Sequence, residues 1–158
     1  MVEPVPGQEI NFDWCSSPLF SFCESSDWEH FSRVVEICDK PAGSRLWSEG
    51  ESGTLLVCVL SGILEAVKKT PDWGKPIIMA QFNSGSTVGE LICAEGEKSI
   101  HSTTLQVVED ARLLLCRASQ AELLFNDFPV TAARLWRGAA CLQQLRLRQV
   151  NRRLTTLF

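Results

Sequence analysis

Gly89, Glu90 and Leu91 form a Gly-Glu-Leu turn, and the polar loop that follows it reaches His101. A glycine beside an acidic residue at the start of a short helix suits an anionic ligand that carries hydroxyl groups. Helix N-terminal amides attract phosphate, while a carboxylate accepts hydrogen bonds from sugar hydroxyls. Which residue would neutralise the phosphate is the question that this segment leaves open.

The composition predicts one globular domain. The chain has 158 residues, of which 45% are hydrophobic and 22% are charged, and a chain of this length buries roughly two thirds of its extended surface on folding. A net charge of -4 and a pI near 5.2 argue against nonspecific binding to nucleic acid or to an anionic membrane. The longest apolar run is also far too short to span a membrane.

The seven cysteines form no CxxC pair, and several lie inside apolar runs, such as Cys58 and Cys116. Their odd number, the absence of a secretory signal and the absence of metal-ligand spacing favour reduced thiols in the cytoplasm and no metal site.

The N-terminal part begins with an arm and continues into an aromatic segment. Residues 1–11 carry two prolines and no periodic apolar pattern, which predicts a flexible, extended arm. From Asp27 to Cys38 the apolar residues have helical spacing, with Ser26 or Asp27 as the N-cap. We expect this helix to stop before Pro41.

Beyond Pro41 the pattern changes to short strands separated by glycine turns, which predicts an antiparallel meander or jelly roll. Turns are expected at Ser61-Gly62 and at Asp72-Trp73-Gly74-Lys75. The expected strands are Arg45–Trp47, Thr54–Leu60, Ile63–Lys68, Ile77–Phe82, Thr103–Val108 and Arg112–Arg117.

The C-terminal part is predicted to be helical, first at Gln120–Phe125 and then in one long helix from about residue 130, with Pro129 at its start. One apolar stripe on this helix is expected to cover the sheet, and it comprises Leu135, Ala139 and Leu142. A second stripe has heptad-like spacing and favours a homodimer through residues 130–157 over a helix packed only on its own domain. It comprises Trp136, Ala140, Gln143, Leu147, Val150, Leu154 and Leu157.

In order along the chain, residues 42–51 (AGSRLWSEGE), 60–67 (LSGILEAV) and 85–91 (GSTVGEL) resemble the cyclic-nucleotide-binding domain, as found in Crp/Fnr regulators and kinase regulatory subunits. The resemblance extends from about Phe12 to Leu154. It implies an α+β fold, with an antiparallel β-roll between an N-terminal helix and a long C-terminal helix, and a domain spanning residues 12–158.

The resemblance implies that Gly89 offers a backbone amide to a cyclic phosphate and that Glu90 binds the ribose hydroxyl. His101 occupies the position of the family's phosphate-binding arginine, and the loop before it is about two residues longer than usual. Leu91, Ser102 and Thr103 complete the expected ligand site. Because a histidine is mostly neutral at cytoplasmic pH, cyclic AMP or cyclic GMP would bind weakly.

The function expected from this resemblance is a regulatory sensor that signals to a protein partner by moving its C-terminal helix. The alternative is a ligand-free dimerising or protein-interaction scaffold, which the missing arginine and the aromatic residues Trp14 and Trp73 favour. No enzymatic activity is expected, because no nucleophile, metalloprotease or phosphate-loop motif is found. The chain ends at Phe158, directly after the long helix, so no DNA-binding domain and no direct contact with nucleic acid are expected. The arginines of that helix are interpreted as a solvated basic face, and they are Arg134, Arg137, Arg146, Arg148, Arg152 and Arg153.

Overall fold

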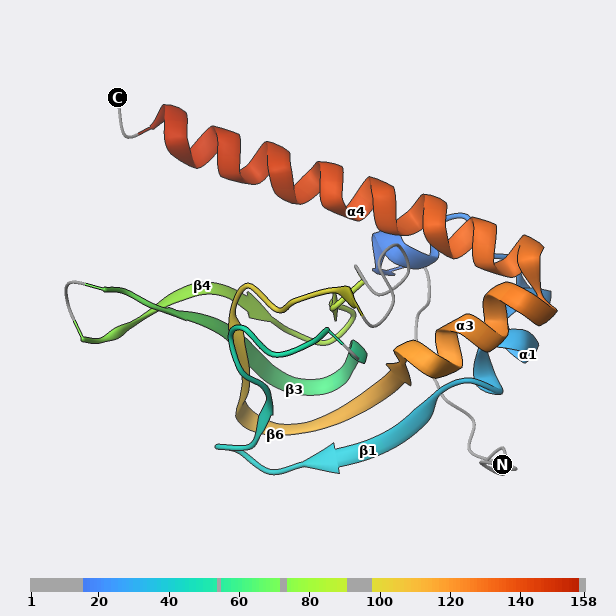
Figure 1. Cartoon of the computed structure of the whole chain (residues 1–158), viewed down its shortest axis with the longest axis horizontal. Coiled ribbons are helices and arrows are strands. Elements are labelled where there is room, and N and C mark those ends of the chain that lie inside the picture. The colour runs from blue at the N-terminus through green and yellow to red at the C-terminus, as the bar shows by residue number, and fades with distance from the viewer. Residues whose placement is uncertain (1–15, 54, 72–73, 91–97, 157–158) are drawn as a thin grey trace.

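The computed structural model describes residues 16–53, 55–71, 74–90 and 98–156. Its antiparallel sheet, the short helices at the N-terminus and the long C-terminal helix confirm the α+β β-roll that the sequence predicts (Figure 1). The arm at residues 1–11, Trp14, Trp73 and Leu91 lie outside the described residues. The elements are η2 (Pro18–Phe20), α1 (Ser25–Ser32), β1 (Glu36–Lys40), β2 (Arg45–Trp47), β3 (Leu55–Lys69), β4 (Pro76–Phe82), β5 (Thr87–Val88), β6 (Thr104–Arg117), α3 (Ala118–Asp127) and α4 (Pro129–Thr155).

The sheet is built around two long strands, β3 and β6. Its order is β1-β6-β3-β4, with β2 on β6 and β5 on β3, and every pairing is antiparallel. Each long strand was expected as two shorter ones, with a tight turn at Ser61-Gly62. Instead, the register shifts at Ser61 and Ile63 while the pairing continues, and these irregularities allow the strands to curl into the roll.

Gly62 explains why the turn signal was misleading. Its φ is +87°, and a Cβ atom at this position would overlap the carbonyl of Asp110 on the neighbouring strand. The glycine is therefore needed for a bulge at which two strands approach closely, rather than for the end of a strand.

The N-terminal helix is shorter than the apolar spacing predicted. It ends at Ser32, and its N-cap is Glu24 rather than Ser26 or Asp27; the Glu24 amide donates to the Asp27 carboxylate at 2.7 Å. The segment expected to continue the helix forms β1 instead, paired along β6 from Glu36 with Leu115 to Lys40 with Ala111. This segment contains β-branched residues that suit a strand, and long-range pairing outweighs its helical spacing.

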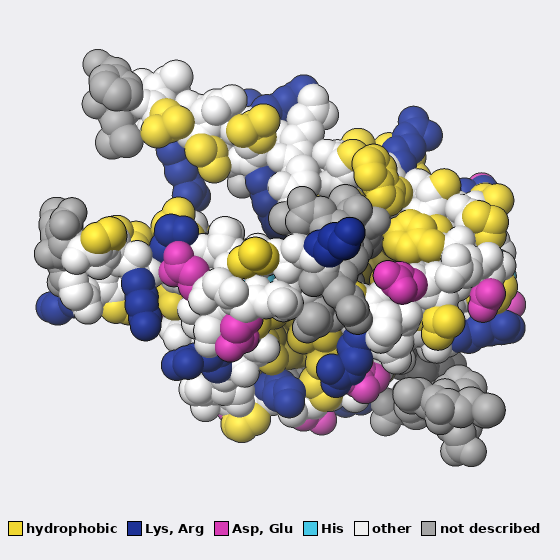
Figure 2. Space-filling model, in the orientation of Figure 1, with side chains coloured by type: hydrophobic (Ala, Val, Ile, Leu, Met, Phe, Trp, Pro, Cys, Tyr) yellow, Lys and Arg dark blue, Asp and Glu magenta, His cyan; other side chains and the backbone are white. Residues whose placement is uncertain are grey.

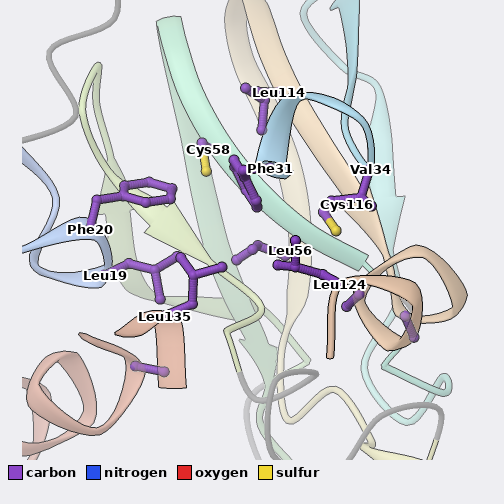
Figure 3. Packing of buried hydrophobic residues seen from close by; sticks show 13 residues of the cluster. Leu19, Phe20, Phe31, Val34, Leu56, Cys58, Leu114, Cys116, Leu124 and Leu135 are labelled. Atoms are coloured by element: carbon purple, nitrogen blue, oxygen red, sulfur yellow. The ribbon is translucent and has the colours of Figure 1, made fainter. Parts of the chain in front are cut away.

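Two apolar clusters form the core. One lies inside the roll, and the other fills the space between the sheet and the helices. Leu19 and Phe20 of η2, Phe31 of α1 and Leu135 of α4 belong to the second cluster, as Figure 3 shows. Cys58 and Cys116 are buried in this same cluster and form no disulfide, as the sequence predicts for them.

The long helix α4 begins at Pro129, and its two apolar stripes differ in burial as expected. Leu135, Ala139 and Leu142 are buried, whereas Trp136, Leu147, Val150 and Leu154 are each about half exposed. Gly138 lies so close to η2 that a Cβ atom there would overlap the Leu19 carbonyl. The distal half of α4 projects toward the same side of the molecule as the β3–β4 hairpin (Figures 1 and 2).

Candidate functional site

Glu90 is positioned by the short strand β5 and by Gly89, which follows that strand. Val88 pairs with Val57 of β3, and Gly89 then adopts a φ of +85° with no room for a Cβ atom beside the Leu55 carbonyl. Only glycine fits this combination of left-handed backbone and close approach. The turn directs the next side chain inward, so Glu90 is just 1% exposed.

Helix α4 contributes two partners to the Glu90 carboxylate. The side-chain amide of Gln143 donates to Oε1 at 2.6 Å, and Arg146 forms an ion pair with the same oxygen. Arg146 also donates to the Thr87 carbonyl at 2.6 Å, and its guanidinium lies 5.8 Å from the centre of the Phe82 ring. The carboxylate expected to bind a ribose is therefore already tied to the C-terminal helix.

The second oxygen of the same carboxylate, Oε2, is buried and has no hydrogen-bond partner among the described residues. Burial raises the pKa of the Glu90 carboxyl above its ordinary value, and the neighbouring Arg146 opposes that rise. Because a buried acceptor without a partner costs free energy, Oε2 is a place where a donor from a ligand would be stabilising.

His101 is buried against Trp47 of β2. The two rings are stacked with their centres 3.9 Å apart and their planes within 5° of parallel, and the indole of Trp47 donates to the Thr103 carbonyl at 3.0 Å. The His101 backbone is fixed as well, because its amide donates to the Glu51 carbonyl at 2.9 Å. The imidazole is therefore held in one orientation.

The protonation of His101 follows from this burial. Burial lowers the pKa of the imidazole below its usual value of 6.5, and the nearby Glu51 carboxylate opposes the change. The ring is thus neutral at pH 7, and its Nε2 atom is buried without a hydrogen-bond partner among the described residues. Unlike an arginine, it offers a phosphate one hydrogen bond and no permanent charge.

The other expected site residues are less buried. Ser102 is exposed, and its carbonyl accepts a hydrogen bond from Lys68 at 3.0 Å. Thr103 is half-buried and Lys98 is exposed. Within the described residues, the structure brings Gly89 and Glu90 together with α4 and places His101 on Trp47, with no direct hydrogen bond between Glu90 and His101.

Arg146 and Gln143 are the residues that the sequence analysis missed. Gln143 was assigned to the stripe for a partner and Arg146 to a solvated basic face. That interpretation is wrong for Arg146, which pairs with Glu90, and for Arg134, which donates to Asp27 at 2.8 Å. A signal was available for Arg146, because it lies four residues after the buried Leu142 and so faces the same side of the helix.

The comparison with protein families decides the assignment. Residues 39–127, more than half of the chain, match the model of the cyclic nucleotide-binding domain. The chain belongs to this family. Its cyclic nucleotide-binding domain thus contains the Gly89-Glu90 turn and His101 within the matched range.

Solved structures with the same fold come from distant relatives. A cyclic nucleotide-binding domain from Methylobacillus flagellatus has a TM-score of 0.77 at 16% identity, covering 89% of this chain and 80% of that one. The catabolite activator protein of Thermus thermophilus has a TM-score of 0.72 at 24% identity, covering 89% of this chain and 63% of that one. These identities support the fold alone.

A third similar structure is the regulatory subunit of a cAMP-independent protein kinase A from Trypanosoma brucei, a triple mutant bound to cAMP. Its TM-score is 0.66 at 16% identity, and the alignment covers 84% of this chain and 44% of that one. The comparison with curated protein sequences found no match. In the described part of the chain, no helix has the length and apolar character of a membrane span.

Proposed function

We propose that this domain is a regulatory module that weakly binds a cyclic nucleotide or a related phosphorylated ligand and signals through α4. One observation carries the proposal: the carboxylate of Glu90 has one oxygen on Gln143 and Arg146 of α4 and the other oxygen buried without a partner among the described residues. A ligand hydroxyl that donates to Oε2 would share a single carboxylate with the helix. Occupancy of the site is thereby coupled to the position of α4.

His101 accounts for the weakness of the proposed binding. A neutral imidazole replaces the charged, two-pronged contact that an arginine makes with a phosphate. The Trypanosoma brucei kinase subunit supports this reasoning, because the subunit is cAMP-independent and its cAMP-bound form is a mutant in which one of three substitutions introduces an arginine. A module of this kind has no catalytic role, and its free thiols suit a reducing cytoplasm.

Calorimetric titration with cyclic AMP and cyclic GMP at pH 6 and pH 8 tests the proposal. Binding in the high micromolar to millimolar range is expected, and it should be tighter at pH 6 because a larger fraction of His101 is then protonated. The variant His101→Arg should bind about 100-fold more tightly, the value of a charged bidentate contact. No heat from either nucleotide, with the wild type or the variant, would contradict the proposal.

A second function, the ligand-free scaffold, is favoured by a different observation. Arg146 and Gln143 already satisfy one oxygen of Glu90, and α4 exposes Leu147, Val150 and Leu154 on one face. Under this alternative the domain serves to dimerise or to hold a protein partner, and the Glu90 contact simply fixes α4. A null result in both titrations, together with self-association through α4, would favour it.

A further inference from the structure

A cavity lies between η2, α1 and the first turn of α4. Its volume is about 530 Å³, which is within the range of small-molecule sites. Among the described residues, those recorded in contact with Glu90 or His101 do not line it, so the cavity is separate from the site described above. Its lining includes Phe20, Cys23, Asp27, Trp28, Phe31 and Thr131.

Three aromatic rings of this lining adjoin one another. The rings of Phe20 and Phe31 have their centres 5.4 Å apart in an edge-to-face arrangement, and Trp28 lies 6.0 Å from Phe31. Phe20 comes from η2 and Phe31 from α1, and both belong to the core shown in Figure 3. Adjoining rings offer an aromatic ligand edge and offset contacts, which contribute beyond the apolar area that they bury.

The thiol of Cys23 makes the lining still more apolar. Burial raises its pKa to about 11, the Asp27 carboxylate adds to that rise, and Arg134 opposes it. The thiol is therefore uncharged at pH 7, and an uncharged cysteine behaves as a small, polarisable hydrophobe. The cavity thus combines three rings with a neutral sulfur.

The two buried polar side chains of the lining, Asp27 and Thr131, already have partners. Oδ1 of Asp27 accepts from the Thr131 hydroxyl, and Oδ2 accepts from the Glu24 amide at 2.7 Å and from Arg134 at 2.8 Å. Because the Thr131 hydroxyl donates to Asp27, it accepts the hydrogen bond from Nδ1 of His30 at 2.9 Å. A polar group of a ligand would have to displace one of these partners, and such an exchange brings little net gain.

The charges at the cavity lie at its solvent edge. The charged side chains of the lining that the structure describes are Glu24 and Asp27, and Arg134 pairs with both, at 2.7 Å and 2.8 Å. One negative charge is left over, and it belongs to Glu24, whose side chain is 66% exposed. Water screens an exposed charge, so this excess favours a cation over an anion only slightly.

We propose that this cavity is a second ligand site of the domain and that it binds a small, uncharged aromatic molecule between α1 and α4. The ring of the ligand packs against the aromatic residues of the lining and leaves the bonds of Asp27 and Thr131 intact. This inference is independent of the proposed function, because it uses neither Glu90 nor His101.

The test is a calorimetric comparison of indole, tryptamine and indole-3-acetate on the full chain at pH 7.5. The three probes carry the same ring with no charge, a positive charge and a negative charge. Indole is expected to bind with a dissociation constant of about 1 mM or lower. Tryptamine should bind within about fivefold of indole, because the exposed Glu24 contributes little, and indole-3-acetate should bind more weakly than indole.

Three outcomes of this comparison would overturn the inference. No binding of indole at millimolar concentration would show that the cavity holds no aromatic ligand. Tryptamine that binds more than tenfold tighter than indole would show that the site recognises an ammonium group. Indole-3-acetate that binds more tightly than indole would show that it recognises an anion.

A substitution at Cys23 tests the location of the site. Cys23→Trp places an indole ring of the protein itself in the cavity, and it should weaken indole binding at least tenfold. The matched control is Glu29→Trp, which adds the same ring at an exposed position of α1 outside the recorded lining and should leave the affinity within about twofold of wild type. Equal indole affinity in both variants would contradict the location.

The location can also be tested without any substitution. Nuclear Overhauser effects between the ring protons of indole and those of Phe31 are expected on the wild-type chain, because both rings would line the same cavity. Contacts of bound indole with other aromatic residues only, and none with Phe31 or Trp28, would overturn the inference even where Cys23→Trp fails to fold.

Discussion

Arg146 pairs with a buried carboxylate although it is itself partly exposed to solvent. It neutralises a carboxylate that is 1% exposed, yet its own side chain is 32% exposed at the edge of the roll. Removing one partner of a buried pair leaves the other charge without compensation, and partial access to water reduces the cost.

Arg146→Gln is accordingly expected to lower the free energy of unfolding by about 2 kcal/mol. Urea denaturation followed by circular dichroism measures the change. The matched control is Arg148→Gln, which lies on the exposed side of the same helix and should stay within about 0.5 kcal/mol of wild type. Equal stability of the two variants would show that the Glu90 contact contributes nothing to the fold.

His101 makes stability depend on pH. Because burial lowers the pKa of the folded imidazole below 6.5, the unfolded chain binds more protons than the folded chain at and below that pH. Stability rises with pH wherever the unfolded state binds more protons. The contribution of His101 is therefore complete above pH 7 and is lost as the pH falls through 6.5 toward the folded pKa.

The predicted signature is a fall in the free energy of unfolding between pH 7.5 and pH 5.5 that is smaller in His101→Gln. The Glu90 carboxyl, whose pKa is raised, titrates with the opposite sign. The difference between wild type and variant isolates the histidine, because Glu90 is common to both. An NMR titration of His101 with a midpoint above 6.5 would contradict the assigned burial.

At the scale of elements, helix α4 carries one buried and one exposed apolar stripe. Its buried stripe of Leu135, Ala139 and Leu142 closes the core, and its exposed stripe leaves Leu147 60% exposed and Val150 50% exposed. An apolar stripe at heptad spacing is the pattern of a helix that packs on another helix. We predict that a second copy of this chain covers it.

Leu147→Glu should convert such a dimer into a monomer, because two carboxylates would then face each other in the seam. Light scattering at several protein concentrations measures the change in mass. Gln149→Glu is the matched control, since it adds the same charge at an exposed position on the same half of the helix. A wild-type chain that is monomeric at millimolar concentration would refute the dimer.

The elements differ in how far their sequences predict them. Pro129 and the periodic apolar pattern that follows it locate α4, a helix of 27 residues, because helix start signals and periodicity are local. β1 was mistaken for helix and β3 for two strands, since both depend on pairing with β6, far along the chain.

For the site, Gly89 and Glu90 follow from a local turn motif. Arg146 and Gln143 lie more than 50 residues after Glu90 in the sequence, and no local sequence pattern predicts that they contact it.

At the scale of the whole molecule, the site and the exposed stripe share a residue. Gln143 belongs to the heptad-spaced stripe and also donates to Glu90. Anything that moves Glu90 therefore acts on the surface that a second copy would cover, and linkage requires the effect to be mutual.

A saturating concentration of whichever compound binds should consequently change the dimer dissociation constant severalfold, and the monomeric Leu147→Glu variant should bind that compound with a different affinity. Analytical ultracentrifugation with and without the compound measures the dimer dissociation constant, and calorimetry on the wild-type chain and on the variant measures the affinity for the compound. An unchanged dissociation constant together with equal affinities would mean that the site and the stripe are independent.

The close contact of Gly138 with Leu19 gives α4 a pivot. Because the two backbones touch there without an intervening side chain, η2 resists sliding of the helix more than it resists rotation. With a rise of about 1.5 Å per residue, Arg146 lies roughly 12 Å from this point and Leu154 roughly 24 Å. A rotation about Gly138 would thus displace the free end of α4 about twice as far as it displaces the guanidinium at the site.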